Sequence, residues 1–203
     1  MAVYTKINQK EINIINENFN IDKIKSFKGI KQGIENTNYL LKSKKKRYIL
    51  TIFEKRVLQK EIPFFMRLMD NLNNSKINCP KPLKTKENKY LIKLKNKTAC
   101  IVSFLEGKDK KLLDINDCYA VGKTIARIHM ITNKMNLNRK NSMGIRNLKP
   151  LLESIKFKSK KFSKLKIFLK NNLKEINKNW PKQLPKGIIH GDLFLDNIFL
   201  SLI

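Results

Sequence analysis

The stretch IIHGDLFLDNIFL, residues 188–200, decides how the rest of the sequence is interpreted. Two apolar runs enclose a histidine, a glycine, two aspartates and an asparagine within eight residues. Burial of the apolar runs would hold the polar side chains at fixed offsets, as in loops that carry function. Asp192 and Asn197 are five positions apart, and His190 is two positions before Asp192. The stretch therefore predicts a polar loop between two β-strands.

An aspartate followed by an asparagine at this spacing suits phosphoryl transfer to a hydroxyl group. That reaction needs one carboxylate to orient and deprotonate the hydroxyl, and oxygen ligands for the Mg²⁺ that holds the phosphates. The alternative is an ordinary turn, because Asp and Asn side chains hydrogen-bond to nearby backbone groups and tolerate unusual backbone angles. Asp196 is interpreted in this second way, as a turn or capping residue.

The first half of the chain has the pattern of an antiparallel sheet with helices. Apolar or alternating runs, separated by glycines and by the turn KSKKKR, predict three strands within residues 24–54 and two more within residues 77–107. Helical spacing predicts a short opening helix with Thr5 as its cap, and a second helix within residues 58–75 with Pro63 in its first turn.

After residue 107 the pattern becomes helical. Asp114 is the predicted cap of a helix that ends near residue 132, and two more helices are expected before Trp180. Several side chains are expected to face a core: Val121, Ile125, Ile128, His129, Met130 and Trp180. The predicted fold class is α+β and bilobal, with a β-rich lobe over residues 1–106 and a helical lobe over residues 107–203. Clefts between lobes commonly bind ligands.

The charge of the chain is strongly positive but spread out. Lys and Arg number 44 against 16 Asp and Glu, a formal net charge of +28. The lysines occur in every segment, and Lys, Asn and Ile all have A/T-rich codons, so genome composition accounts for the excess as well as a polyanionic partner would. A non-catalytic basic module that binds nucleotides or nucleic acid stays open as an alternative, but no Arg-rich face supports specific nucleic-acid binding.

The cysteines and the N-terminus indicate a cytoplasmic protein. Cys79, Cys100 and Cys118 have no CxxC spacing, which argues against a disulfide framework or a zinc site. The N-terminus lacks the apolar core of a signal peptide, and no apolar run is long enough to cross a bilayer, so no membrane partner is expected.

The stretch HGDLFLDN resembles the catalytic loop of the aminoglycoside-phosphotransferase superfamily, small-molecule kinases with a protein-kinase-like fold. Further stretches in the same order resemble the homoserine kinases of that superfamily: MAVYTKI, SFKGIKQGIENTNYLL, YILTIFEKR, PFFMRLMDNL, CPKPL, IVSFLEG and WPKQLPKGIIHGDLFLDN. The resemblance implies ATP-dependent phosphorylation of the L-homoserine hydroxyl in threonine biosynthesis, with ATP and Mg²⁺ as cofactors. Choline, ethanolamine or an aminoglycoside stay open as acceptors.

The resemblance also implies roles for single residues. Asp192 would be the catalytic base and Asn197 a Mg²⁺ ligand. His190 is the second predicted catalytic residue, expected to brace the loop through hydrogen bonds, with acid–base work as the alternative. Thr51 stands where many superfamily members have a phosphate-binding lysine, so Lys55 or Arg56 would supply the charge, with Glu61 as its helix partner. The predicted nucleotide-binding residues are therefore Gly29, Gly33, Asn36, Thr51, Lys55 and Glu61. An ordinary hairpin and solvated surface lysines are the alternatives.

One feature of protein kinases has no counterpart in this sequence. Protein kinases use a second metal-binding Asp on a strand after the catalytic loop, but only six residues follow Asn197 and none is acidic. We therefore expect the helical lobe to be incomplete, the chain to match the first two-thirds of a homoserine kinase, and the isolated chain to be nearly inactive. An exposed apolar edge is also expected at NIFLSLI, residues 197–203.

Overall fold

The structure, a computed structural model, describes residues 3–32, 35–54, 58–107, 110–142, 144–155, 160–181 and 183–200. Its contacts divide the chain into two compact units, Met1–Leu137 with Gly187–Ile203, and Asn138–Lys186. The lobe boundary near residue 106 lies inside the first unit and stays a prediction. None of the described helices combines the length and the apolar character needed to cross a bilayer.

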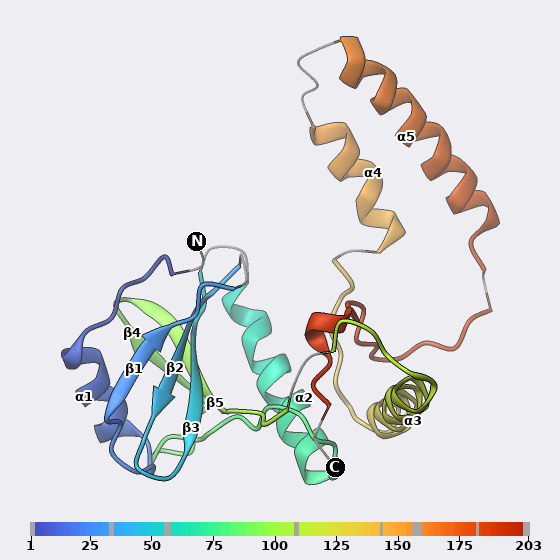
Figure 1. The fold of residues 1–203 in the computed structure, drawn as a ribbon. Helices are drawn as coiled ribbons and strands as arrows, with labels where there is room; N and C mark the ends of the chain where they lie inside the picture. Colours follow the sequence, from blue (N-terminus) through green and yellow to red (C-terminus); the bar gives the residue numbers. More distant parts are fainter. Residues whose placement is uncertain are drawn as a thin grey trace. The chain divides into compact units, whose positions relative to one another are not determined.

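A five-stranded antiparallel sheet forms the centre of the first unit (Figure 1). Its strands are β1 (Ser26–Gly29), β2 (Thr37–Lys42), β3 (Arg47–Ile52), β4 (Leu91–Leu94) and β5 (Lys97–Ser103). They lie in the order β1-β2-β3-β5-β4, and the β2–β3 register places Asn38 opposite Thr51. The five strands predicted from the sequence are confirmed.

Helices cover the two faces of this sheet because alternate strand residues point to opposite sides. Helix α1 (Gln9–Asn18) contributes Ile12 and Ile15 to a core with Leu41, Leu50 and Ile101. On the other face, α2 (Ile62–Asn74) packs Ile62 and Met66 against Cys100 and Val102 of β5. Each fully buried apolar side chain contributes about 1.5–3 kcal/mol to folding.

The start of α1 corrects one prediction. The N-cap is Asn8, whose side chain accepts a hydrogen bond from the backbone N–H of Lys10 at 2.8 Å, while Glu11 accepts from the Asn8 N–H, also at 2.8 Å. The prediction of Thr5 as the cap is wrong because the Thr5 hydroxyl binds Glu54 on a neighbouring segment instead. Pro63 does lie in the first turn of α2, which follows the short 3₁₀ turn η1 (Gln59–Glu61).

Helix α3 (Ile115–Thr132) begins at its predicted cap, Asp114, whose side chain accepts a hydrogen bond from the Asp117 N–H at 2.9 Å. The predicted core positions Val121, Ile125 and Ile128 are half-buried. His129 and Met130 are exposed, so the expectation that they face a core is wrong. Among the elements that the structure describes, α3 packs against α2, and this contact leaves His129 and Met130 exposed.

The second unit consists of α4 (Ile145–Ser154) and α5 (Lys160–Asn179), which pack against each other (Figure 1). Trp180 follows α5 and is 52% exposed, so its prediction as a core anchor is wrong. A two-helix unit has no second layer to bury residues on the outer sides of its helices.

Candidate active site

The polar loop of residues 187–200 belongs to the first unit. Its described backbone contains one 3₁₀ turn, η2 (Leu195–Asn197), and no strand, although Leu200 takes part in a β-bridge. The two flanking strands predicted from the apolar runs are therefore not present in this part of the chain. An apolar run becomes a strand only where a neighbouring strand can pair with its backbone groups. The side chains of Ile189 and Phe194 are exposed.

The turn brings Asp192 and Asn197 into contact. The Asn197 side-chain amide donates a hydrogen bond to the Asp192 backbone carbonyl at 2.8 Å and another to the Asp192 carboxylate at 3.1 Å. The Asn197 backbone N–H closes the turn on the Phe194 carbonyl at 2.9 Å. Gly191 has φ +74°, a left-handed conformation that favours glycine directly before Asp192. Two residues five positions apart thus present their side chains together.

The Asn197 amide is well placed for a cation. Its nitrogen is used within the loop, which leaves the oxygen, the atom that binds Mg²⁺, as an acceptor. Within the ranges that the structure describes, no group of three or more His, Cys, Asp or Glu side chains could hold a metal ion. The donor set here is one carboxylate and one amide oxygen, which suits Mg²⁺ because this ion keeps several waters and takes further oxygens from phosphates.

His190 contacts the backbone beside Asp192. Its Nδ1 atom accepts a hydrogen bond from the Asp192 N–H at 3.4 Å. The imidazole is thus engaged with the backbone of the loop, and the bracing role stays a prediction.

The predicted nucleotide-binding residues that the structure describes lie on or beside the sheet. Thr51 of β3 donates its hydroxyl hydrogen bond to Asn38 of β2 at 2.8 Å, and both side chains are half-buried on the face opposite α1. Asn36 accepts a hydrogen bond from the Glu54 N–H at 3.2 Å. Glu61 is half-buried and directly precedes α2. Gly33 and Lys55 lie outside the described residues, as does Arg56.

Gly29 is enclosed by the N-terminal segment. A Cβ atom at this position would lie 2.9 Å from Cγ2 of Val3. The structure thus shows Gly29 making room for Val3, at the end of β1 where the chain enters the glycine-bearing loop.

A partly buried ionic cluster that sequence reasoning missed supports the stem of this loop. Glu54 accepts hydrogen bonds at 2.7 Å from both Thr5 and Thr37, and it pairs with Lys97. Burial by itself would raise the pKa of Glu54, but the hydrogen bonds from Lys97, Thr5 and Thr37 outweigh burial and hold the pKa below its ordinary value. The signal in the sequence was a carboxylate directly after the apolar run YILTIF.

A cavity of about 440 Å³ adjoins the polar loop. His190 and Asn197 line it together with the connection after α2 and one side of α3. Its walls include the side chains of Val121, Ile125, Leu193, Ile198 and Phe199. Polar side chains line this cavity from the loop and also from α3, which contributes Thr124 and Arg127 beside its apolar residues.

Comparisons with known proteins place this site in context. A sequence model of the phosphotransferase enzyme family matches residues 26–201. The homoserine kinase of Paramagnetospirillum magneticum is 38% identical over 200 residues, which are 98% of this chain and 61% of that protein. The homoserine kinase of Bartonella tribocorum is 36% identical over 202 residues, 98% of this chain and 63% of that protein. The chain thus spans less than two thirds of the length of these relatives.

A solved structure shares the fold. The crystal structure of spectinomycin phosphotransferase in complex with ADP and spectinomycin matches with a TM-score of 0.65 at 18% sequence identity, over 98% of this chain and 67% of that chain. The likeness confirms the α+β, protein-kinase-like fold class predicted from the sequence.

Proposed function

The chain belongs to the phosphotransferase enzyme family over residues 26–201, and from this membership we propose that it is part of an ATP-dependent homoserine kinase. The enzyme transfers the γ-phosphate of ATP to the hydroxyl group of L-homoserine and forms O-phospho-L-homoserine. The acceptor is supported by relatives named homoserine kinase that match 98% of this chain at 36% and 38% identity. The observation in the structure that carries the proposal is the contact between Asn197 and Asp192.

Asp192 is the catalytic base in this proposal. Its carboxylate orients the homoserine hydroxyl and accepts the proton as the oxygen attacks the γ-phosphate. The Asn197 amide donates to the same carboxylate and keeps it at a fixed position in the loop. His190 holds the backbone N–H of Asp192, so it is a positioning residue.

Mg²⁺ fits the oxygen donors of the loop. The Asn197 side-chain oxygen would be one ligand, and the ion would neutralise charge on the phosphates. We propose that, in the homoserine kinase relatives, a second carboxylate ligand of Mg²⁺ lies in the part of their chain that this chain does not match.

The nucleotide is proposed to bind the lobe of residues 1–106, with the catalytic loop in the lobe of residues 107–203. Asn36 and Thr51 lie on β2 and β3 or beside them, on the side of the sheet away from α1, and the Glu54 cluster holds the stem of the glycine-bearing loop. The related spectinomycin phosphotransferase was solved with ADP, which supports ATP as the donor. The cysteines described, Cys79, Cys100 and Cys118, are all free, which agrees with the cytoplasm as the proposed compartment.

The proposal is tested with two proteins: residues 1–203, and a chimera that adds the unmatched part of the Paramagnetospirillum magneticum relative. ADP release is measured with Mg·ATP and L-homoserine, and separately with choline, ethanolamine and an aminoglycoside. We expect the chimera to release ADP only with L-homoserine. Turnover with another acceptor and not with homoserine would overturn the assignment of the substrate.

The role of Asp192 is tested in the chimera with the same assay. Asp192→Asn should lower kcat about a thousandfold, because it removes the proton acceptor. Asp196→Asn is the matched control, since Asp196 is an exposed aspartate in the same turn, and its kcat should stay within a factor of about two, as usual for an exposed surface change. Equal losses in the two variants would contradict the role of Asp192.

A further inference from the structure

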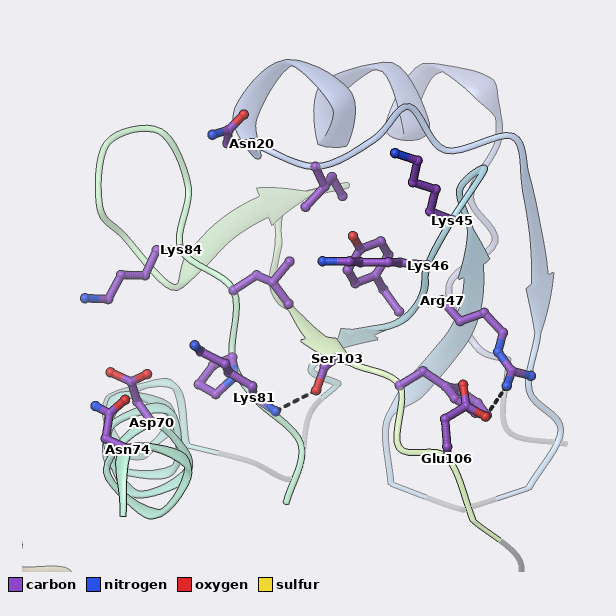
Figure 2. A pocket seen from close by; sticks show the side chains of 15 residues that line it. Asn20, Lys45, Lys46, Arg47, Asp70, Asn74, Lys81, Lys84, Ser103 and Glu106 are labelled. Carbon is purple, nitrogen blue, oxygen red and sulfur yellow. Dashed lines mark hydrogen bonds and ion pairs between the residues drawn. The ribbon is translucent and has the colours of Figure 1, made fainter. Parts of the chain in front are cut away.

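The largest of the cavities described lies apart from the residues of the proposed reaction (Figure 2). It has a volume of about 800 Å³ and lies between the β2–β3 turn, the end of α1, residues 81–84 and the segment that follows β5. None of the described residues to which the proposed reaction assigns a role lines it.

Basic side chains enter this cavity from two sides. Lys45 and Lys46 lie in the β2–β3 turn, with Arg47 at the start of β3. Lys81 and Lys84 lie on the segment that pairs with the end of β5, where the Ser103 N–H donates to the Lys81 carbonyl at 2.8 Å. Figure 2 shows Lys46 pointing from the turn toward residues 81–84. The β2–β3 turn and the segment of residues 81–84 thus both bring positive charge to the cavity.

The carboxylates of the cavity are already engaged. The Tyr90 hydroxyl donates to Asp70 at 2.6 Å, and Arg47 forms an ion pair with Glu106. The Nζ atoms of Lys45, Lys46 and Lys81 form no ion pair or hydrogen bond with any residue that the structure describes. At least three ammonium groups at this cavity therefore lack a counter-charge within the described chain.

The floor of the cavity is apolar. Tyr48 is 6% exposed, and Ile21 and Leu83 are partly buried and pack against the same core. Beside them, the Arg47 guanidinium lies 4.2 Å from the centre of the Phe104 ring. A ligand that fits this lining combines a flat or apolar body with a strongly charged anionic group.

We propose that this cavity binds a small phosphate ester, with its phosphate held by Lys46 and Lys81 and its apolar part on the floor formed by Ile21, Tyr48 and Leu83. A phosphate dianion matches two uncompensated ammonium groups from opposite sides, whereas a single carboxylate would leave one of them without a partner. The site is separate from the proposed kinase reaction and does not depend on it.

Attraction by net charge alone and binding in this cavity predict different selectivity among anions. A net charge of +28 attracts every anion, weakly and with strong screening by salt. A cavity with an apolar floor discriminates between anions of equal charge, because burial of apolar surface adds to the binding of one of them. Phenyl phosphate has an apolar ring that the floor can bury, and inorganic phosphate has none.

The experiment titrates phenyl phosphate, inorganic phosphate and phenol into residues 1–203 at pH about 8, where both phosphates are mainly dianions, and at an ionic strength of about 0.15 M, where exposed charges are screened beyond about 8 Å. Binding is followed by amide proton–nitrogen correlation spectra, without ATP or homoserine. Phenyl phosphate should bind about tenfold more tightly than inorganic phosphate, because the ring is buried. The largest shifts should occur at Lys46, Lys81 and Ser103.

Two double variants of equal net charge locate the site. Lys46→Ala with Lys81→Ala should weaken phenyl phosphate binding about tenfold, as expected for loss of charged hydrogen bonds. Lys123→Ala with Lys134→Ala removes two exposed lysines on and just after α3, neither of which lines this cavity, and should leave binding within about twofold, as for a surface change away from the site. Should the first variant not fold, Lys46→Gln with Lys81→Gln replaces it.

Three results would overturn the proposal. Equal weakening in both double variants would show that only net charge matters. Equal affinity for phenyl phosphate and inorganic phosphate would show that the floor takes no part. Shifts confined to residues outside the cavity would place the ligand elsewhere. Because no kinase substrate is present, each result is independent of the proposed reaction.

Discussion

At the scale of single residues, Glu54 joins three parts of the chain that are distant in sequence. Its carboxylate receives Thr5 from the N-terminal segment, Thr37 from β2 and Lys97 from β5. The Glu54 side chain is 11% exposed, so its charge is stabilised by these partners more than by water. The cluster holds the N-terminal segment on the sheet and anchors the stem of the glycine-bearing loop.

Glu54→Gln should lower the free energy of unfolding by about 1–2 kcal/mol, because it leaves the Lys97 ammonium without its counter-charge. Urea denaturation measures this change. Glu87→Gln is the matched control: Glu87 pairs with Lys89 on the surface, both side chains are at least 70% exposed, and no measurable change is expected. Equal stability of the two variants would contradict the role given to the Glu54 cluster.

The depressed pKa of Glu54 also predicts a pH dependence. A carboxyl whose folded pKa lies below its ordinary value stabilises the fold above that value and loses this contribution as the pH falls through the folded pKa. The free energy of unfolding should therefore decrease as the pH is lowered through 4.5, the ordinary value, and below it. In the Glu54→Gln variant this decrease should be smaller. The same pH profile of unfolding free energy in the variant and the unchanged chain would contradict the lowered pKa of Glu54.

The three cysteines should differ in reactivity. Cys100 is buried under α2, and burial raises the pKa of its thiol to about 12; burial also raises the pKa of Cys79 to about 11. Cys118 is exposed on α3. Since the thiolate is the reactive form, iodoacetamide should modify Cys118 first, Cys79 slowly, and Cys100 only after unfolding. Mass spectrometry of peptides from timed samples measures the order, and early labelling of Cys100 would contradict the packing of α2 on β5.

At the scale of elements, close approach of backbones explains why the segment after β5 contains a glycine. Gly107 has φ +152°, and a Cβ atom there would lie 3.1 Å from the Leu200 carbonyl oxygen and 3.2 Å from Cβ of Phe199. The segment that leaves the sheet therefore passes directly beside the end of the polar loop of residues 187–200.

Gly107→Ala should destabilise the first unit by about 1–3 kcal/mol, because the backbone conformation and the contact with Leu200 both oppose a side chain. Thermal unfolding followed by circular dichroism measures the effect. Gly187→Ala serves as the control, since a Cβ there meets no atom within 4 Å. A destabilised Gly187→Ala variant beside an unaffected Gly107→Ala variant would contradict the arrangement of the loop.

Elements were predicted well where the pattern is local. The five strands, α2 with Pro63 in its first turn and α3 with its cap Asp114 follow from spacing and end signals over a few residues. The cap of α1 was predicted wrongly because Thr5 and Asn8 are both good capping residues, and the long-range contact of Thr5 with Glu54 decides between them. The strands beside the loop were overpredicted because pairing depends on a neighbour that the local pattern does not contain.

At the scale of the whole molecule, the outstanding feature is uncovered apolar surface. On α3, Ile115 is 87% exposed and Tyr119 is 70% exposed. Exposed apolar side chains also occur on α5 and in the polar loop of residues 187–200, among them Phe162, Phe168, Phe194 and Phe199. The relatives are longer than the part that this chain matches, so additional chain is available in them to cover such surface.

We expect residues 1–203 to bind the dye ANS strongly and the chimera with the unmatched part of the Paramagnetospirillum magneticum relative to bind it several-fold less, since contiguous apolar surface attracts hydrophobic ligands. Fluorescence titration at equal protein concentration measures the difference. A chimera that binds as much dye as residues 1–203 would show that the added segment does not cover α3 or the loop.

The sequence by itself determined the order of the elements and the loop that carries Asp192 and Asn197, because these follow from spacing among near neighbours, while the family was indicated by resemblance to known homoserine kinases along the chain. Only the tertiary structure decided that Thr5, Thr37, Glu54 and Lys97 form one cluster, that Trp180 and His129 are exposed, and that lysines from two distant segments line one cavity. The physical reason is that burial and charge pairing depend on which distant segments pack together. Local patterns constrain those contacts only weakly.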